Sequence, residues 1–130
     1  MKNLTLALAA TLTLGLSACD AYAAGHGAPA KTMESSAGEI LTNGDGMSLY
    51  TFDADGELAS NCAGGCAASW PPHMAPAEAH ENGDFAPVTR ADGSLQWAYQ
   101  GKPLYTWVGD SAPGDITGDG VGGNWHLARP

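Results

Sequence analysis

The sequence predicts a mainly β protein in which two tandem copies of one β-hairpin-plus-loop unit form a small pseudo-symmetric domain, with one or two short helices. Three observations support this fold class. The 130 residues include 18 glycines and 8 prolines but only 15% charged residues, which favours turns over long amphipathic helices. Short runs of strand character recur along the chain. The motifs of the first half also return, in the same order, in the second half.

The N-terminal segment has the pattern of an export signal. The apolar run 4–16 is too short to span a bilayer and follows a basic residue, as in secretory signals. The sequence Leu16-Ser17-Ala18-Cys19 resembles a bacterial lipobox, in which the cysteine is acylated and becomes the first residue of the mature chain. We therefore expect a lipoprotein signal peptide over 1–18 and a membrane anchor on Cys19, facing the periplasm or the cell exterior. Cleavage after Ala21-Tyr22-Ala23 is the alternative and predicts a soluble exported protein.

A tether and a duplicated region follow the signal. Residues 19–37 are small, polar and aperiodic, so we expect a flexible tether that ends near Gly38. Beyond it, the run 46–52 returns as 101–107 at an ungapped offset of 55 residues. The same offset relates Trp70 to Trp125 and Asp55 to Asp110. We expect a duplicated β domain over 38–130, with the first copy at about 38–92 and the second at about 93–130.

The strands and helices can be placed by periodicity and turn residues. Glycines at 44, 46 and 101 supply the positive φ angles that hairpin turns require. Helices are expected only over 62–69 and 75–80, the second with a proline in its first turn. Strands are expected over 39–42, 48–52, 85–90, 95–99, 104–108 and 124–129.

Two cysteines remain once Cys19 is set aside. Cys62 and Cys66 form an even pair in an exported chain, which predicts a structural disulfide. The loop between them is so short that the chain-entropy gain is only about 2 kcal/mol. A redox-active or metal-binding pair is the alternative, but thioredoxin-like motifs have two intervening residues, whereas this pair has three.

The ordered motifs of the chain are similar to those of the bacterial secreted-repeat lipoproteins, which carry a Tyr-x-aromatic-x-x-Asp motif. The resemblance covers about residues 38–130 and implies an envelope-anchored, duplicated β domain. It implies no activity and no catalytic residue, and the family has no established function. His73-Met74 departs from the expected pattern, either as a specialisation or through drift. The matching motifs are Tyr50-x-Phe52-x-x-Asp55, Cys62-x-x-x-Cys66, Trp70-Pro71-Pro72, Tyr105-x-Trp107-x-x-Asp110 and Trp125-His126.

The repeated motif has two interpretations. In the first, its aromatic residues fill a small core while Asp55 and Asp110 cap the loops that follow. In the second, the aromatic residues line a cleft between the two halves, where a flat or hydrophobic ligand lies.

Metal binding has limited support. The residues that could form a copper site are His26, His73, His80 and His126, with Met33, Met47 and Met74. Their spacing gives no support, because no two of these histidines lie one helical turn apart. Calcium could be held by Asp110, Asp115 and Asp119, although the EF-hand spacing and its terminal glutamate are missing. We favour ordinary Asx-turns as the explanation of these residues. We expect no cofactor other than the acyl group on Cys19.

Several function classes are disfavoured. The net charge of −9 argues against nucleic acid as a partner. Nucleophile-elbow, phosphate-loop and zinc-protease motifs are missing, and the paired acids Asp53 and Asp55 are typical of solvated residues beside a turn. The main hypothesis is a non-enzymatic cell-envelope lipoprotein that binds or scaffolds an envelope protein or small ligand. The alternative is an exported copper-handling protein that uses His73 and Met74.

Overall fold

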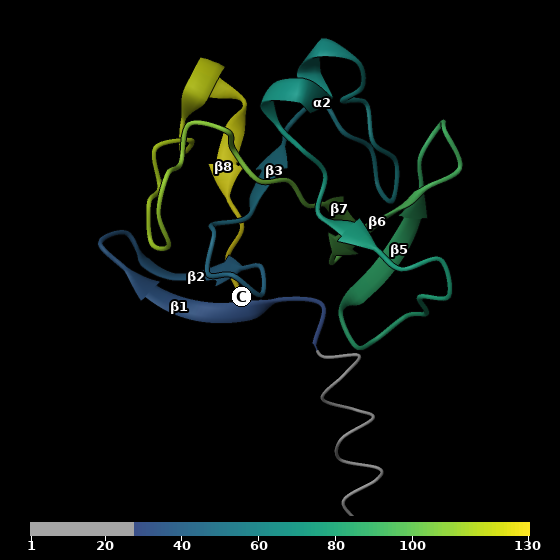
Figure 1. Cartoon of the computed structure of the whole chain (residues 1–130), viewed down its shortest axis with the longest axis horizontal. Coiled ribbons are helices and arrows are strands. Elements are labelled where there is room, and N and C mark those ends of the chain that lie inside the picture. The colour runs from purple at the N-terminus through teal and green to yellow at the C-terminus, as the bar shows by residue number, and fades with distance from the viewer. Residues whose placement is uncertain (1–27) are drawn as a thin grey trace, which may run out of the picture.

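The computed structural model describes residues 28–130 of the chain (Figure 1). Within this part the protein is mainly β, with one short α-helix and one 3-10 turn, which confirms the predicted fold class. In chain order the elements are β1 Lys31–Ser35, β2 Gly38–Thr42, β3 Tyr50–Phe52, α2 Gly65–Ser69, β4 Met74–Ala75, β5 Phe85–Thr89, β6 Leu95–Tyr99, β7 Lys102–Pro103, the 3-10 turn Val121–Gly123, and β8 Trp125–Leu127.

The strands form three small antiparallel sheets. β1 pairs with β2, and β3 pairs with β8, the last strand of the chain. In the third sheet β6 lies between β4 and β5 and also pairs with β7. Strands from opposite ends of the sequence therefore share sheets, as Figure 1 shows for the yellow β8 beside the teal β3.

A pseudo-two-fold axis relates the two repeats. The N–H of Tyr50 donates to the carbonyl of Tyr105 at 2.8 Å, and the N–H of Tyr105 donates back to the carbonyl of Tyr50 at 3.0 Å. These residues are repeat equivalents, and an equivalent residue paired with its own counterpart is the signature of a two-fold axis. The predicted equivalence of Tyr50 and Tyr105 is confirmed, and the relation between the copies is a rotation.

The repeats also exchange their C-terminal strands. In β3, Thr51 lies opposite His126 of β8. At the equivalent place in the other half, the N–H of Thr106 donates to the carbonyl of Pro71 at 2.8 Å. The neighbouring hydrogen bond is also present in both halves. The N–H of Ala128 donates to the Leu49 carbonyl at 2.8 Å, and the N–H of its equivalent, His73, donates to the Leu104 carbonyl at 2.9 Å. Each repeat thus completes the sheet of the other.

The prediction of a flexible tether up to residue 37 is wrong for residues 31–35, because they form strand β1. β1 lies antiparallel to β2 from the Lys31–Thr42 pair to the Ser35–Gly38 pair. Gly38 adopts a φ of 97°, which closes the turn, and the Ser35 side chain accepts a 3.0 Å bond from the N–H of Ala37. Consequently β2 takes β1 as its main partner. The hairpin expected between 39–42 and 48–52 is reduced to one bridge, between Thr42 and Ser48.

The helix predicted over 75–80 is also wrong. Met74 and Ala75 form β4, with Met74 opposite Gln96 of β6, and the chain then passes through a single turn in which the N–H of Ala79 donates to the carbonyl of Pro76. Strand pairing with the second repeat outweighs the weak local helix signal here. The other predicted helix exists but is shorter, and comprises only Gly65–Ser69.

Two apolar clusters fill the interior. One gathers the aromatic residues of the repeated motif, with Trp70 and Trp125, around Ile40 and Cys62. The other packs Leu41, Leu49 and Leu104 against Trp97. Within residues 28–130, no helix is both long and apolar enough to cross a bilayer.

Candidate functional site

The tyrosine and aspartate of the repeated motif bond across the repeat boundary. The Tyr50 hydroxyl donates to Oδ2 of Asp110 at 2.7 Å, and the Tyr105 hydroxyl donates to Oδ2 of Asp55, also at 2.7 Å. Both tyrosines are fully buried. The tyrosine of each copy therefore holds the aspartate of the other copy, and a hydrogen bond to a carboxylate is among the stronger kinds.

The second oxygen of each aspartate caps the loop that follows it. Oδ1 of Asp55 accepts the N–H of Asn61 at 2.6 Å. Oδ1 of Asp110 accepts both the N–H and the hydroxyl of Thr117, at 2.9 and 2.7 Å. This agrees with the loop-capping interpretation of the motif. The bond to the tyrosine of the other repeat was not foreseen.

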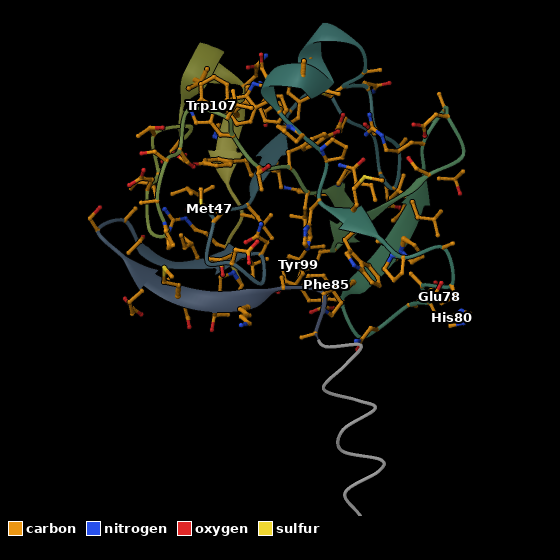
Figure 2. The ribbon with its side chains drawn as sticks, viewed as in Figure 1. Met47, Glu78, His80, Phe85, Tyr99 and Trp107 are labelled. Atoms are coloured by element: carbon orange, nitrogen blue, oxygen red, sulfur yellow. A yellow bond between two sulfur atoms is a disulfide. The ribbon has the colours of Figure 1, made fainter. Side chains whose placement is uncertain are left out.

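Four aromatic rings from the two repeats form one continuous stack. Trp70 and Trp125, which are repeat equivalents, lie at its centre with ring centroids 3.8 Å apart and planes 1° from parallel. Phe52 stacks on the outer face of Trp125 at 4.2 Å, and its equivalent Trp107 stacks on Trp70 at 4.2 Å. The order of the rings is therefore unchanged when the repeats are exchanged. Trp107 is labelled at the α2 and β8 end of the molecule in Figure 2.

The motif tyrosines also contact this stack. The rings of Tyr50 and Trp70 form a T-shaped pair with centroids 5.4 Å apart, and those of Tyr105 and Trp125 form a second with centroids 5.1 Å apart. Edge-to-face and offset-stacked contacts are the arrangements that the ring quadrupoles favour. Most aromatic residues of the motif thus pack against one another in the core.

Burial controls the ionisation of the motif tyrosines. It raises the pKa of Tyr105 to about 12, with a further rise from the Asp55 carboxylate and an opposing effect of the Ser60 hydroxyl. Burial and the Asp110 carboxylate raise the pKa of Tyr50 as well. The hydroxyls therefore stay protonated at neutral pH and act as hydrogen-bond donors. Burial also raises the pKa of Asp55, against hydrogen bonds from Asn61 and Tyr105 that lower it.

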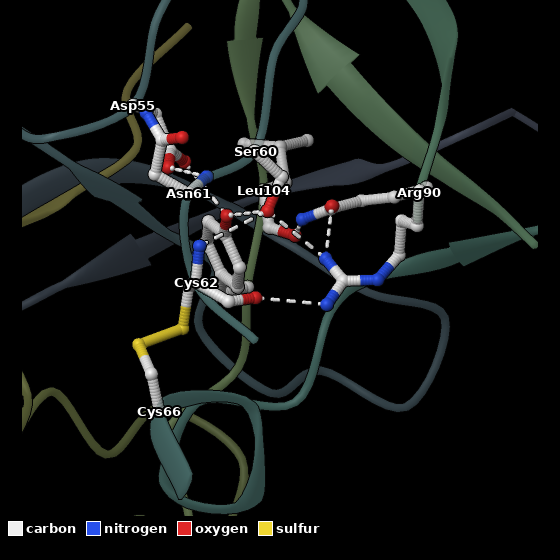
Figure 3. Close-up of a disulfide and its surroundings, with 9 residues drawn as sticks. Asp55, Ser60, Asn61, Cys62, Cys66, Arg90 and Leu104 are labelled. Carbon is white, nitrogen blue, oxygen red and sulfur yellow. Dashed lines mark hydrogen bonds between the residues drawn. A yellow bond between two sulfur atoms is a disulfide. The ribbon is translucent and has the colours of Figure 1, made fainter. Parts of the chain in front are cut away.

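The predicted disulfide is present. Cys62 and Cys66 are bonded, with Cα atoms 5.2 Å apart, and the bond lies between the first capped loop and helix α2 (Figure 3). Cys62 is fully buried among the aromatic residues.

Arg90 of the second repeat also contacts this loop, and no sequence motif marks it. Its guanidinium donates to the Ser60 hydroxyl at 3.0 Å, to the Gln96 amide oxygen at 2.7 Å and to the Cys62 carbonyl at 2.8 Å (Figure 3). The bonds to Ser60 and Cys62 connect the two repeats, whereas the bond to Gln96 lies within the second repeat, so structural contacts occupy the guanidinium.

Aspartates order the loop of the second repeat. Oδ2 of Asp115 accepts the N–H groups of Ser111 and Ala112 at 2.8 and 3.0 Å, and these bonds lower its pKa. Oδ1 of Asp119 accepts the N–H of Leu127 at 3.1 Å. This is the turn chemistry expected as the alternative to calcium. Residues 28–130 contain no group of three or more histidine, cysteine, aspartate or glutamate side chains arranged to hold a metal ion.

The suggested copper ligands do not come together as a set in the described part of the chain. The ring of His73 forms a hydrogen bond with the carbonyl of Pro29, so this side chain is engaged in a contact inside the folded domain. His126 pairs with Asp53 at 2.8 Å. Met74 is half exposed, and Figure 2 shows His80 at the far edge of the molecule, next to Glu78.

A groove lies where the motif of the first repeat meets the β6–β7 turn of the second. Its volume is about 250 Å³. Phe52, the outer ring of the stack, supplies an apolar wall, and the polar lining includes Asp53, Glu57, Gln100 and Lys102. Gln100 adopts a φ of 49°, an unusual angle for a residue with a side chain, and it places this turn at the groove.

Comparison with known families agrees with this duplicated design. Residues 31–74 and 86–129 each match a family model described as a secreted repeat of unknown function. The chain belongs to this secreted-repeat family. The two matches keep the 55-residue offset and begin earlier than the repeat boundaries expected from the sequence, so that β1 is included in the first copy. The family is described as secreted, so the protein is exported.

No curated protein and no solved structure matches the chain. The signal peptide predicted over 1–18 and the predicted acylation site Cys19 lie outside the residues that the structure describes.

Proposed function

We propose that this protein is a non-enzymatic lipoprotein of the cell envelope that acts as a binding module and is anchored through an acyl group on Cys19. The arrangement of the motif supports the non-enzymatic part. Both tyrosine hydroxyls and both aspartates of the motif are engaged in bonds that fasten the repeats together. The chemistry that marks the family is therefore used to build a rigid body.

The groove beside Phe52 is the single observation that carries the binding role. One wall is an aromatic ring, while Glu57 and Asp53 offer carboxylate oxygens and Gln100 and Lys102 offer N–H donors. A mixed lining of this kind suits a small polar molecule that has one apolar face and several hydroxyl groups. Saccharides have this character, and an exported protein meets the glycans of the envelope. We therefore assign the groove to a saccharide unit.

The test is a titration of the soluble chain from residue 20 with chitotriose, followed by amide NMR shifts. Shifts are expected at Gly56 and Gly101, which line the groove. Glu57→Gln should weaken binding about tenfold, because it removes a charged acceptor. Glu78→Gln is the matched control, since Glu78 lies in the exposed connection outside the groove. Shifts elsewhere in the molecule, or equal weakening by both variants, would contradict this assignment.

A further inference from the structure

The contacts between the two repeats have the form of a dimer interface within one chain. Three kinds of contact occur twice: the backbone bonds between Tyr50 and Tyr105, the tyrosine–aspartate bonds, and the outer ring pairs of the stack. In a two-fold dimer of identical subunits, each contact appears twice for the same reason. The covalent connection between the copies takes no part in any of these contacts.

Neither repeat is complete without the other. β3 of the first repeat has β8 of the second as its sheet partner, and β6 of the second has β4 of the first. Trp70 and Trp125 each cover the other in the centre of the stack, and both are almost fully buried. A repeat alone would expose these rings and leave strand edges unpaired, which is an unstable state.

We propose that the surface each repeat presents to the other is a docking site for the opposite repeat of a second copy of this chain. Two copies then join by exchanging repeats. The first repeat of one chain pairs with the second repeat of the other, so that Tyr50 of one chain bonds to Asp110 of the other. The remaining two repeats pair in the same way. This inference goes beyond the binding function proposed above and does not depend on the groove.

The connection between the repeats decides whether a chain closes on itself. Residues 76–84 join β4 to β5, and nearly all of them are exposed. β4 and β5 lie on opposite sides of β6, with Ala75 opposite Leu95 and Phe85 opposite Tyr99. The connection must therefore cross two strand spacings and four residues along β6, a straight distance of roughly 17 Å.

The present connection is long enough for closure. Nine residues reach about 33 Å when extended, and they hold the repeats at an effective concentration in the millimolar range. The closed monomer therefore dominates in dilute solution. Exchange is favoured where copies are crowded, and anchoring through Cys19 would crowd them on a membrane. Hinge connections of this kind are the usual route to domain swapping.

Shortening the connection tests the proposal directly. Deleting residues 77–82 leaves three residues, which reach only about 14 Å and cannot close the monomer. The soluble chain with this deletion should have twice the wild-type mass in light scattering, and its near-ultraviolet circular dichroism should match the wild type because the ring stack is retained. A folded monomer would overturn the proposal, and so would a monomeric unfolded chain.

A second variant keeps the full connection and adds a protease site after Glu78. After cleavage, the two pieces should elute together and separate only on dilution. Tyr50→Phe with Tyr105→Phe should raise their dissociation constant by about a hundredfold or more, because two bonds to charged groups are lost. Tyr99→Phe is the control, because the ring of Tyr99 makes a tilted contact with Phe85, its neighbour across β5 and β6. Pieces that separate at once, or a dissociation constant that the double variant leaves unchanged, would refute the docking site.

Discussion

Replacing Tyr50 with phenylalanine removes one hydroxyl group and keeps the ring that packs against Trp70. That hydroxyl donates to Asp110 at 2.7 Å and accepts the N–H of Gly118 at 3.1 Å. Both partners are in the interior, and Asp110 is only 8% exposed. The substitution therefore leaves a buried carboxylate oxygen and a buried N–H without the group that satisfies them.

The expected cost follows from these two losses. A hydrogen bond to a charged group contributes about 1.5–3 kcal/mol, and an unsatisfied buried donor adds to the penalty. We expect Tyr50→Phe to lower the free energy of unfolding by about 2–4 kcal/mol. Tyr105→Phe should cost less, about 1–2 kcal/mol, because its partner Asp55 is half-buried and water can replace the lost donor.

The assay is urea unfolding followed by tryptophan fluorescence. A double-mutant cycle with Asp110→Asn isolates the pairwise energy, which should be at least about 1 kcal/mol. Tyr99→Phe serves as the control, because the Tyr99 hydroxyl forms no hydrogen bond to residues 28–130, and it should stay within about 0.5 kcal/mol of the wild type. A Tyr50→Phe effect no larger than that of the control would refute the claim that the motif fastens the two repeats.

Three further predictions concern other parts of the chain. Burial lowers the pKa of His73 below its ordinary 6.5, so unfolding takes up a proton below that pH. The contribution of neutral His73 to the free energy of unfolding should therefore be fully present above pH 6.5 and be lost on acidification, by at most about 1.4 kcal/mol per pH unit. His73→Gln should reduce this pH dependence, which urea unfolding at several pH values measures. Replacing Cys62 and Cys66 with alanine should cost at least about 2 kcal/mol, measured by thermal unfolding, because loop closure and a buried sulfur are both lost. Cys19→Ala should move the protein from the membrane fraction to the soluble exported fraction. A wild type that is already soluble and begins at Ala24 would contradict the anchor.

Sequence reasoning succeeded where the signal was local or duplicated. The disulfide follows from two cysteines four positions apart, and the loop caps follow from the position of each aspartate after a strand. The offset of 55 residues makes the two copies equivalent. None of these inferences requires knowledge of how the chain returns on itself.

The interface between the repeats could not be obtained in the same way. A duplication is compatible with a translation or a rotation, and only a rotation brings Tyr50 to Asp110, 60 positions away. The strand exchange has the same origin, because β8 completes β3 only when the end of the chain returns. β1 was missed because Met33 is its one large apolar residue, so its strand pattern is weak.

The loop of the second repeat provides a last test of how the two halves fit together. A Cβ atom added to Gly118 would lie 2.9 Å from the Tyr50 ring and 3.0 Å from the rings of Trp107 and Trp70. Since φ of Gly118 is not in the left-handed region, any effect of Gly118→Ala is steric. We expect a loss of about 1–3 kcal/mol, as for overpacking in a tight core.

The first repeat provides the matching control. Gly65 lies in helix α2, and nothing surrounds its added Cβ within 4 Å, so Gly65→Ala should be neutral or should stabilise the helix by up to about 1 kcal/mol. Both variants add one methyl group, which meets three aromatic rings at Gly118 and open space at Gly65. If Gly118→Ala unfolds at the same urea concentration as the wild type, the loop does not close on the ring stack. The stack would then be held by the strands and the tyrosine–aspartate bonds alone.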